Sequence, residues 1–268
     1  MNNKSIVICG GDKRQKYMYE YMVEKGLKVS TFGMEGEEDV EKLKNYDVVI
    51  LPVPVTKDGE HINGPYRIRL DDIMSVLCDT QIVLGGVCGG MDMIDYYLDE
   101  EFQFKNALLT AEGAMQIAME NTDFTINGSE YAVLGYGRIG KLLAAMIKNM
   151  GAVVTVCARN PKQLAMAKTF GFETMHINQL ENMGRFDVIF NTVPKTVMDG
   201  RVLEDTKNDV LIIELAGKPY GIDLKAAEEL NKNVIVASGL PGRVAPKTAG
   251  KILCDVILDI LGGMENGT

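Results

Sequence analysis

The sequence contains no tryptophan and only two histidines, His61 and His176. The histidines lie far apart and in no metal-ligand pattern, so we expect no protein-ligated metal site. A nucleophilic mechanism that needs a histidine base would have to use one of these two. The five cysteines are an odd number and form no Cys-x-x-Cys pair, which favours free thiols in a reducing cytoplasm.

Long apolar runs and basic runs are also absent. No stretch approaches the roughly 18 apolar residues of a membrane span, and the first apolar run stops at Gly10, which is too short for a signal peptide. Lys and Arg number 28 against 37 Asp and Glu, a net charge of −9. We therefore expect a cytoplasmic protein that binds neither nucleic acid nor a membrane. A few local cations must then meet any acidic ligand.

The sequence does contain a repeated α/β plan. Its 268 residues predict about two domains, and strand-like runs alternate with helical patterns, which indicates parallel sheets. Gly10 and Gly26 bracket a helical stretch after one strand, as Gly135 and Gly151 do after another. Three later pairs of strand-like runs resemble each other: 46–54 and 186–194, 81–87 and 210–215, 107–110 and 234–237.

We predict an α/β fold of two Rossmann-like domains with parallel sheets, joined by a bridging helix. Residues 1–110 form a substrate-side Rossmann-like domain, 111–124 the bridging helix and 125–245 an NAD(P)-binding Rossmann domain. Residues 246–268 form a C-terminal helix that packs back on the first domain, because Pro246 suits the first position of a helix.

A dinucleotide site is predicted in the second half, where Gly135, Gly137 and Gly140 form a G-x-G-x-x-G pattern between a strand and a helix. These glycines permit a tight turn, close approach to a pyrophosphate and close helix–strand packing. The helix start supplies N–H groups to the phosphates. The expected cofactor-binding residues follow this loop and the ends of the next strands: Gly135, Gly137, Arg138, Ile139, Gly140, Arg159, Asn160, Thr192, Val193, Pro194, Leu215 and Ala216.

The residue that follows the strand over residues 153–158 is expected to determine whether NAD or NADP binds. Arg159 follows this strand where an acidic residue would bind the ribose 2′-hydroxyl of NAD. An arginine suits the 2′-phosphate of NADP instead. We predict NADP, with NAD as the alternative.

The first half lacks the glycine pattern and is not a second dinucleotide site. Aligning Gly10 on Gly135 places Asp12 at the position of Gly137, where a carboxylate repels a pyrophosphate. The turn leads instead into a helix start with Lys13, Arg14 and Gln15. This is a fitting cradle for a small carboxylate, which Arg14 would bind through two of its guanidinium nitrogens. The alternative is a solvated first helical turn.

Three blocks of sequence, at 9–15, 110–129 and 239–250, resemble the A subunit family of dipicolinate synthase. The resemblance covers nearly the whole chain. It implies an oxidoreductase subunit of spore dipicolinate biosynthesis, which forms pyridine-2,6-dicarboxylate from dihydrodipicolinate or its hydrated precursor. It also implies a partner, the flavoprotein-like B subunit, together with a homo-oligomer and the two-domain fold of 2-hydroxyacid dehydrogenases. The His/Glu catalytic pair of those dehydrogenases is absent here.

A dianionic substrate would need two cradles, which we place at the Gly11 turn and at the start of the last helix, where the dipole adds to the charge of Lys247. The candidate base is Glu112 or Lys247, and a structural role at a helix start is the alternative for each. The chain is alternatively an NADP-dependent dehydrogenase of another small dicarboxylate, or a non-catalytic nucleotide-binding partner of the B subunit. The predicted substrate-binding residues are Gly11, Asp12, Arg14, Gln15, Pro241 and Thr248.

Overall fold

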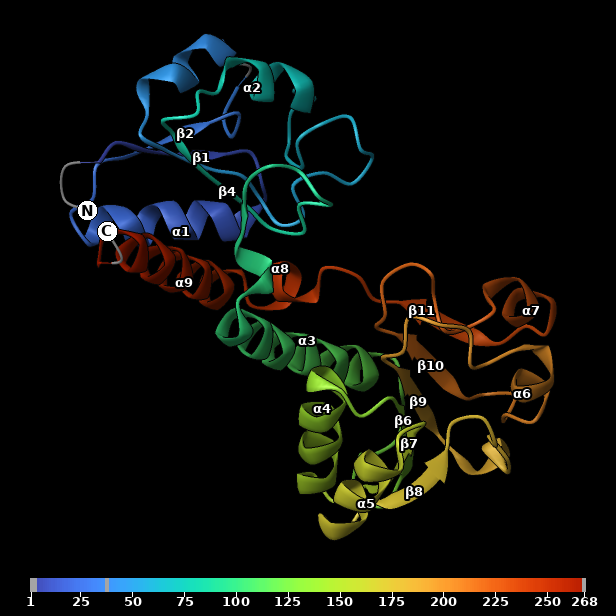
Figure 1. The fold of residues 1–268 in the computed structure, drawn as a ribbon. Helices are drawn as coiled ribbons and strands as arrows, with labels where there is room; N and C mark the ends of the chain where they lie inside the picture. The colour runs from blue at the N-terminus through green and yellow to red at the C-terminus, as the bar shows by residue number, and fades with distance from the viewer. Residues whose placement is uncertain (1–3, 37–38, 267–268) are drawn as a thin grey trace. The chain divides into compact units, whose positions relative to one another are not determined.

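The computed structural model describes residues 4–36 and 39–266, and the chain divides into two compact units (Figure 1). The first unit comprises Met1–Asn106 and Ala245–Thr268, and the second comprises Ala107–Val244. Each unit contains one parallel sheet with apolar clusters on both faces. The predicted α/β fold with two Rossmann-like domains is therefore confirmed.

The first unit has a five-stranded sheet in the order β2-β1-β3-β4-β5, with all strands parallel. Because side chains alternate along a strand, Ile6 and Ile8 pack under α1 and α9, and Val7 packs under α2. The elements are β1 (Ile6–Cys9), α1 (Lys13–Glu24), β2 (Val29–Phe32), η1 (Val40–Asn45), β3 (Val48–Ile50), α2 (Leu70–Val76), β4 (Ile82–Gly85), β5 (Ile94–Asp95), η2 (Tyr96–Leu98) and α9 (Pro246–Asn266).

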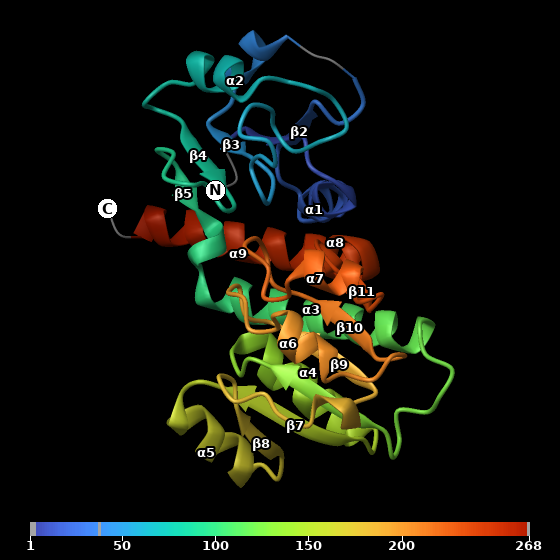
Figure 2. The ribbon, with the colours of Figure 1, turned by 90° about the vertical axis from the view of Figure 1, so that its right-hand side faces the viewer.

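The second unit has a six-stranded parallel sheet in the order β11-β10-β9-β6-β7-β8, the strand order of dinucleotide-binding folds. Helices α3, α4 and α5 cover one face, and α6 and α7 cover the other. Figure 2 shows α5 beside β7 and β8. The elements are α3 (Glu100–Glu120), β6 (Glu130–Leu134), α4 (Arg138–Asn149), β7 (Val153–Ala158), α5 (Pro161–Thr169), β8 (Glu173–His176), η3 (Met183–Arg185), β9 (Val188–Asn191), α6 (Gly200–Glu204), β10 (Leu211–Glu214), α7 (Leu224–Glu229), β11 (Asn233–Val236) and α8 (Leu240–Val244).

The repeat noticed in the sequence corresponds to real elements in both sheets. Strands β1, β2, β3 and β4 of the first unit match β6, β7, β9 and β10 of the second, and their neighbours in each sheet are the same. The second unit differs by β8, which is added at the sheet edge beyond β7. Within the described residues, no helix has the length and apolar character needed to cross a membrane.

The bridging helix is longer than predicted, and the strand expected over residues 107–110 is wrong. Residues 100–120 form one helix, α3, instead of a strand followed by a helix over 111–124. A four-residue apolar run does not distinguish a strand from a buried turn of helix. Here Ala107 and Leu109 are buried as part of the helix. Glu112 consequently lies in the middle of α3 rather than at a helix start.

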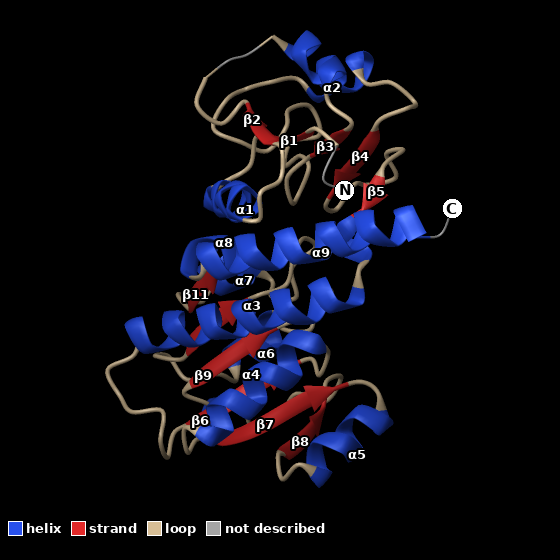
Figure 3. Cartoon of the chain, turned by 90° about the vertical axis from the view of Figure 1, so that its left-hand side faces the viewer, coloured by secondary structure: helices blue, strands red, loops and turns tan. Residues whose placement is uncertain are grey.

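Helix α9 packs against α1 within the first unit, as predicted for the C-terminal helix (Figures 1 and 3). A Cβ atom on Gly250 would lie 2.6 Å from the Arg14 carbonyl oxygen, so the two backbones touch there. Farther along, the Lys251 ammonium lies 5.4 Å from the centre of the Tyr21 ring, and Lys25 lies 3.8 Å from Asp255. The contacts advance along both helices in the same direction.

We expect Gly250→Ala to lower the free energy of unfolding by about 1–3 kcal/mol, because overpacking a filled contact costs this much. The matched control is Gly263→Ala in the same helix, where an added Cβ would meet no atom within 4 Å. That change should stabilise the protein by up to about 1 kcal/mol through helix propensity. Urea denaturation measures both. Equal effects of the two substitutions would contradict the close α1–α9 contact.

Candidate dinucleotide-binding site

The loop between β6 and α4 has the geometry that its glycines predict. Gly135 has a φ of +98°, and a Cβ atom there would overlap the Thr192 hydroxyl. A Cβ atom on Gly140 would overlap the carbonyl oxygen of Gly135. At Gly137, by contrast, a Cβ atom would meet nothing within 4 Å. The loop is therefore tightly folded on its inner side and open at Gly137, where a phosphate can approach the backbone.

Helix α4 begins directly after this loop and presents an uncapped N-terminus. Gly137 is the N-cap residue, no side chain caps the helix, and the first turn contains no acidic residue. Backbone N–H groups and the positive end of the helix dipole make such an N-terminus a binding site for anionic groups. These features fit the pyrophosphate of a dinucleotide.

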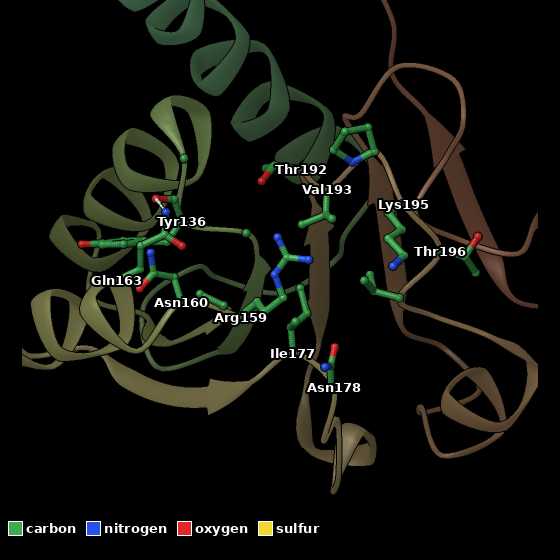
Figure 4. A pocket seen from close by; sticks show the side chains of 15 residues that line it. Tyr136, Arg159, Asn160, Gln163, Ile177, Asn178, Thr192, Val193, Lys195 and Thr196 are labelled. Atoms are coloured by element: carbon green, nitrogen blue, oxygen red, sulfur yellow. Dashed lines mark hydrogen bonds between the residues drawn. The ribbon is translucent and has the colours of Figure 1, made fainter.

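A pocket of about 520 Å³ lies beside the loop and contains no acidic side chain (Figure 4). Two cations line it, Arg159 after β7 and Lys195 after β9. Neither side chain forms a hydrogen bond or ion pair with another described residue. Because the chain as a whole carries a charge of −9, this local excess of positive charge favours an anionic ligand. The lining residues are Gly135, Tyr136, Gly137, Ala158, Arg159, Asn160, Gln163, Ile177, Asn178 and Thr192 to Val197.

Seven of the twelve predicted cofactor-binding residues line this pocket: Gly135, Gly137, Arg159, Asn160, Thr192, Val193 and Pro194. The other five do not line it: Arg138, Ile139, Gly140, Leu215 and Ala216. Gly140 supports the loop from behind, and Leu215 is buried at the end of β10. Lys195 lines the pocket but was not predicted from the sequence. Its signal was its place directly after the strand end 191–194, where side chains reach the carboxyl edge of the sheet.

The predicted carboxylate cradle in the first unit is already occupied by its own side chains. Asp12 caps α1, and Gln15 reaches back to the Asp12 N–H to complete a capping box. The Arg14 guanidinium donates to both oxygens of Asp12, with its Nη2 2.9 Å from Oδ2, and to the Val53 carbonyl oxygen at 2.6 Å. Burial acts to raise the pKa of Asp12, but its bonds to Arg14 and the Arg14 charge outweigh burial and lower it.

Arg14 and Gln15 thus make structural contacts in the first unit, and their predicted substrate roles stay predictions. The Arg14 side chain is only 10% exposed, and its nitrogens hold the helix cap and the turn after β3. Gln15 is completely buried. Gly11 and Asp12 do line a second pocket, of about 500 Å³. That pocket carries Lys13, Lys16, Asp12, Glu20 and Glu35, so its charges of both signs do not select an anion.

The remaining predicted residues are divided between the two units. Lys247 and Thr248 are exposed in the first turn of α9, in the first unit. Glu112 is exposed on α3, and Pro241 is buried in α8, both in the second unit. Helices α3 and α8 meet at Gly113, where a Cβ atom would lie 3.0 Å from the Leu240 Cβ. Both predicted cradles, at the Gly11 turn and at the start of α9, thus belong to the first unit.

Comparison with known proteins assigns both halves of the chain. Residues 5–91 match the family described as the N-terminal domain of the dipicolinate synthase A subunit. Residues 106–243 belong to the family described as "S-adenosyl-L-homocysteine hydrolase, NAD binding domain". The chain is also similar to the dipicolinate synthase A subunit of Bacillus subtilis (strain 168), with 29% identity over 97% of this chain and 96% of that protein.

The chain is similar over nearly its whole length to dipicolinate synthase A subunits. The crystal structure of the family member from Bacillus halodurans superposes with a TM-score of 0.88 and 29% identity, and covers 96% of this chain and 97% of that one. D-lactate dehydrogenase from Escherichia coli shares the fold, with a TM-score of 0.63 at 17% identity over 98% of this chain and 97% of its own.

The similarity to dipicolinate synthase A subunits agrees with the site described above. The second unit is an NAD-binding domain of the dehydrogenase type, and its glycine loop, helix N-terminus and pocket lie where such domains bind a nicotinamide cofactor. The described residues contain no group of three or more His, Cys, Asp or Glu suited to hold a metal ion.

Proposed function

We propose that the chain is the oxidoreductase subunit that forms pyridine-2,6-dicarboxylate from dihydrodipicolinate, or from its hydrated precursor, with NADP as the oxidant. In this reaction the substrate ring loses a hydride to the cofactor and a proton to a base, and the hydrated precursor also loses water. The pocket with its glycine loop and two cations, in a chain similar to dipicolinate synthase A subunits, is the observation that carries the proposal. We further propose a cytoplasmic homo-oligomer that works with a B subunit.

Different residues of the second unit bind different parts of the cofactor. A bound nicotinamide supplies the hydride acceptor. The open turn at Gly137 and the N-terminus of α4 bind the pyrophosphate through backbone N–H groups. Arg159 and Lys195 meet the phosphate on the adenosine ribose. The residues after β9, beginning with Thr192, bound the pocket on its other side.

NADP is proposed over NAD because the chain offers Arg159 and Lys195, and no carboxylate, in this pocket. We expect Arg159→Ala to weaken NADP binding by about 1.5–3 kcal/mol, the contribution of one hydrogen bond to a charged group. This corresponds to roughly 10- to 100-fold in affinity. Binding of NAD should change much less. The control is Lys162→Ala, which removes a neighbouring exposed cation that does not line the pocket. Isothermal calorimetry with both nucleotides checks this, and tighter binding of NAD than NADP to the unaltered protein would contradict the choice.

The substrate carboxylates require local hydrogen-bond donors. Among the predicted ones, Arg14 already bonds to Asp12 and to the Val53 carbonyl. Lys247 and Thr248 remain exposed at the N-terminus of α9, where the helix dipole adds to the Lys247 charge. We propose this helix start as one carboxylate site. The proton acceptor is Lys247 or Glu112, both exposed.

Lys247→Met separates these roles. If Lys247 binds a carboxylate, kcat/KM should fall by roughly 10- to 100-fold, the loss of one charged hydrogen bond. If Lys247 is the base, kcat should also fall by about 100-fold or more. NADP affinity should stay unchanged in both cases. Lys251→Met, one turn later on α9, is the control, and Glu112→Gln tests the other candidate base. Wild-type kinetics in both Lys247→Met and Glu112→Gln would contradict the proposed substrate residues.

The reaction itself is tested by following NADPH formation from freshly generated dihydrodipicolinate precursor. Three preparations are compared: the chain by itself, the B subunit by itself, and their mixture. We expect turnover only when the chain is present. Turnover in the preparation that lacks the chain would make the chain a nucleotide-binding partner. Turnover of another small dicarboxylate, with none of the dihydropyridine, would make it a different NADP-dependent dehydrogenase.

A further inference from the structure

Two buried polar residues join the ends of neighbouring strands beside the pocket. Asn191 ends β9 and Glu214 ends β10, and they are paired in the sheet register. Both residues are 0% exposed. The Asn191 side-chain N–H group donates to both carboxylate oxygens of Glu214, at 2.7 and 2.9 Å. A carboxylate is costly to bury unless its oxygens accept hydrogen bonds. Here both oxygens of Glu214 do so.

Glu214 holds the loop that follows its own strand. Its carboxylate accepts hydrogen bonds from the backbone N–H groups of Ala216, Gly221 and Ile222, at 2.8, 2.9 and 3.1 Å. These bonds draw both ends of the 216–222 loop onto one side chain. Burial raises the pKa of Glu214, although the bonds from Asn191 and from the backbone act to lower it.

Asn191 and Gly221 together hold the segment that lines the pocket. Val193 is bonded at both its N–H and its carbonyl to the Asn191 side chain, each at 3.1 Å. At the other end, the Val197 N–H donates to the Gly221 carbonyl at 2.8 Å. A Cβ atom on Gly221 would overlap both the Asn191 amide and the Val193 carbonyl, so these parts touch directly. Residues 193–197 are therefore fixed at both ends, and all five line the pocket.

Lys195 lies in the middle of this segment and has no partner among the described residues. Its own side-chain contacts therefore do not position it, and the fixed ends of the segment set the point from which its side chain extends. Arg159, the other cation of the pocket, directly follows β7 and takes no part in this hydrogen-bonded group (Figure 4).

We propose that Asn191 and Glu214 are positioning residues, which hold segment 193–197 so that Lys195 meets a phosphate group of the bound nucleotide. This inference rests on the proposal that the pocket binds NADP. The Glu214 carboxylate only accepts hydrogen bonds, from four N–H groups. In Glu214→Gln one of its oxygens becomes an NH2 group, which would face N–H donors and could not bond to them. The segment then loses at least one of its two anchors, and Lys195 loses its position.

A double-mutant cycle on NADP affinity tests this. We expect Glu214→Gln to weaken NADP binding about tenfold in the unaltered protein, and by less than about threefold when Lys195→Ala is already present. In the Arg159→Ala background the loss should remain about tenfold, because Arg159 lies on a different element. A general loss of stability would instead weaken binding equally in all backgrounds. Glu173→Gln, an exposed carboxylate of β8, is the control and should leave affinity unchanged.

An equal effect of Glu214→Gln in the presence and absence of Lys195 would overturn the inference, as would no effect at all. A wild-type protein that binds neither NADP nor NAD would overturn the proposed function instead. Hydrogen exchange on the unaltered protein covers the case in which Glu214→Gln does not fold. The N–H groups of Val193, Val197, Gly221 and Ile222 should be protected without nucleotide, and rapid exchange at these four sites would also overturn the inference.

Discussion

Gly137→Asp is expected to fold like the wild-type protein and to lose nucleotide binding by at least about 100-fold, or ~2.7 kcal/mol. The backbone at Gly137 is extended (φ −82°, ψ −159°) and resembles that of Asp12 (φ −123°, ψ −160°), which caps α1 in the first unit. A carboxylate introduced there should cap α4 in the same way. It would then occupy the N–H groups that bind the pyrophosphate, and its charge would repel it.

Gly137→Asn separates the effect of side-chain size from that of charge, because asparagine has nearly the shape of aspartate but no charge. We expect an intermediate loss of NADP affinity for it. Gly140→Ala provides the opposite contrast, because its Cβ atom would overlap the Gly135 carbonyl and distort the loop itself. Calorimetry gives the affinities, and circular dichroism with thermal unfolding reports the fold. Retained NADP binding in Gly137→Asp would refute the assignment of this loop.

Arg14→Met is expected to lower the free energy of unfolding by about 3 kcal/mol. The guanidinium is nearly buried and bonded to Asp12 and to the Val53 carbonyl. Removing one partner of a buried ion pair leaves the other uncompensated, which costs about 3–5 kcal/mol. The lower end applies here because the Asp12 side chain is 43% exposed. Denaturant unfolding monitored in the first unit measures the effect.

The control is Arg69→Met, whose partner Asp71 is also two residues away but whose pair is exposed, at 56% and 84%. An exposed pair contributes about 0–1 kcal/mol, so little change is expected. NADP affinity should stay unaltered in both variants, since the pocket lies in the second unit. Unchanged stability in Arg14→Met together with a large loss of turnover would restore the role of substrate ligand.

The sequence was informative where local chemistry decides the structure. The glycine loop at 135–140 and the four repeated strands could be predicted, because turn geometry and apolar periodicity are local properties. The role of Arg14 could not, because residue type says nothing of what already occupies a guanidinium. Asp12 lies two positions earlier, and it was predicted to repel a pyrophosphate and to bind substrate, not to pair with Arg14.

Other features depend on contacts between segments far apart in the chain. Asn191 and Glu214 each end an apolar strand run, and nothing in either run shows that their side chains meet. The run 107–110 had the composition of a strand, but it continues into later residues of α3, such as Ala111 and Ala114, which pack in the apolar cluster of the second sheet. Local patterns thus predicted the elements, whereas the positioning residues appear only in the folded chain.

The return of α9 to the first unit has a consequence for biosynthesis. A ribosome delivers residues 1–106 before the second unit, and residues 245–268 after it. Until α9 emerges, the apolar cluster that Met18 and Met22 share with Leu253 and Ile257 has only one of its two helices. The second unit is continuous in sequence and can fold as it is made. The unit that is begun first is therefore finished last, and its apolar cluster stays incomplete until the last helix of the chain has been made.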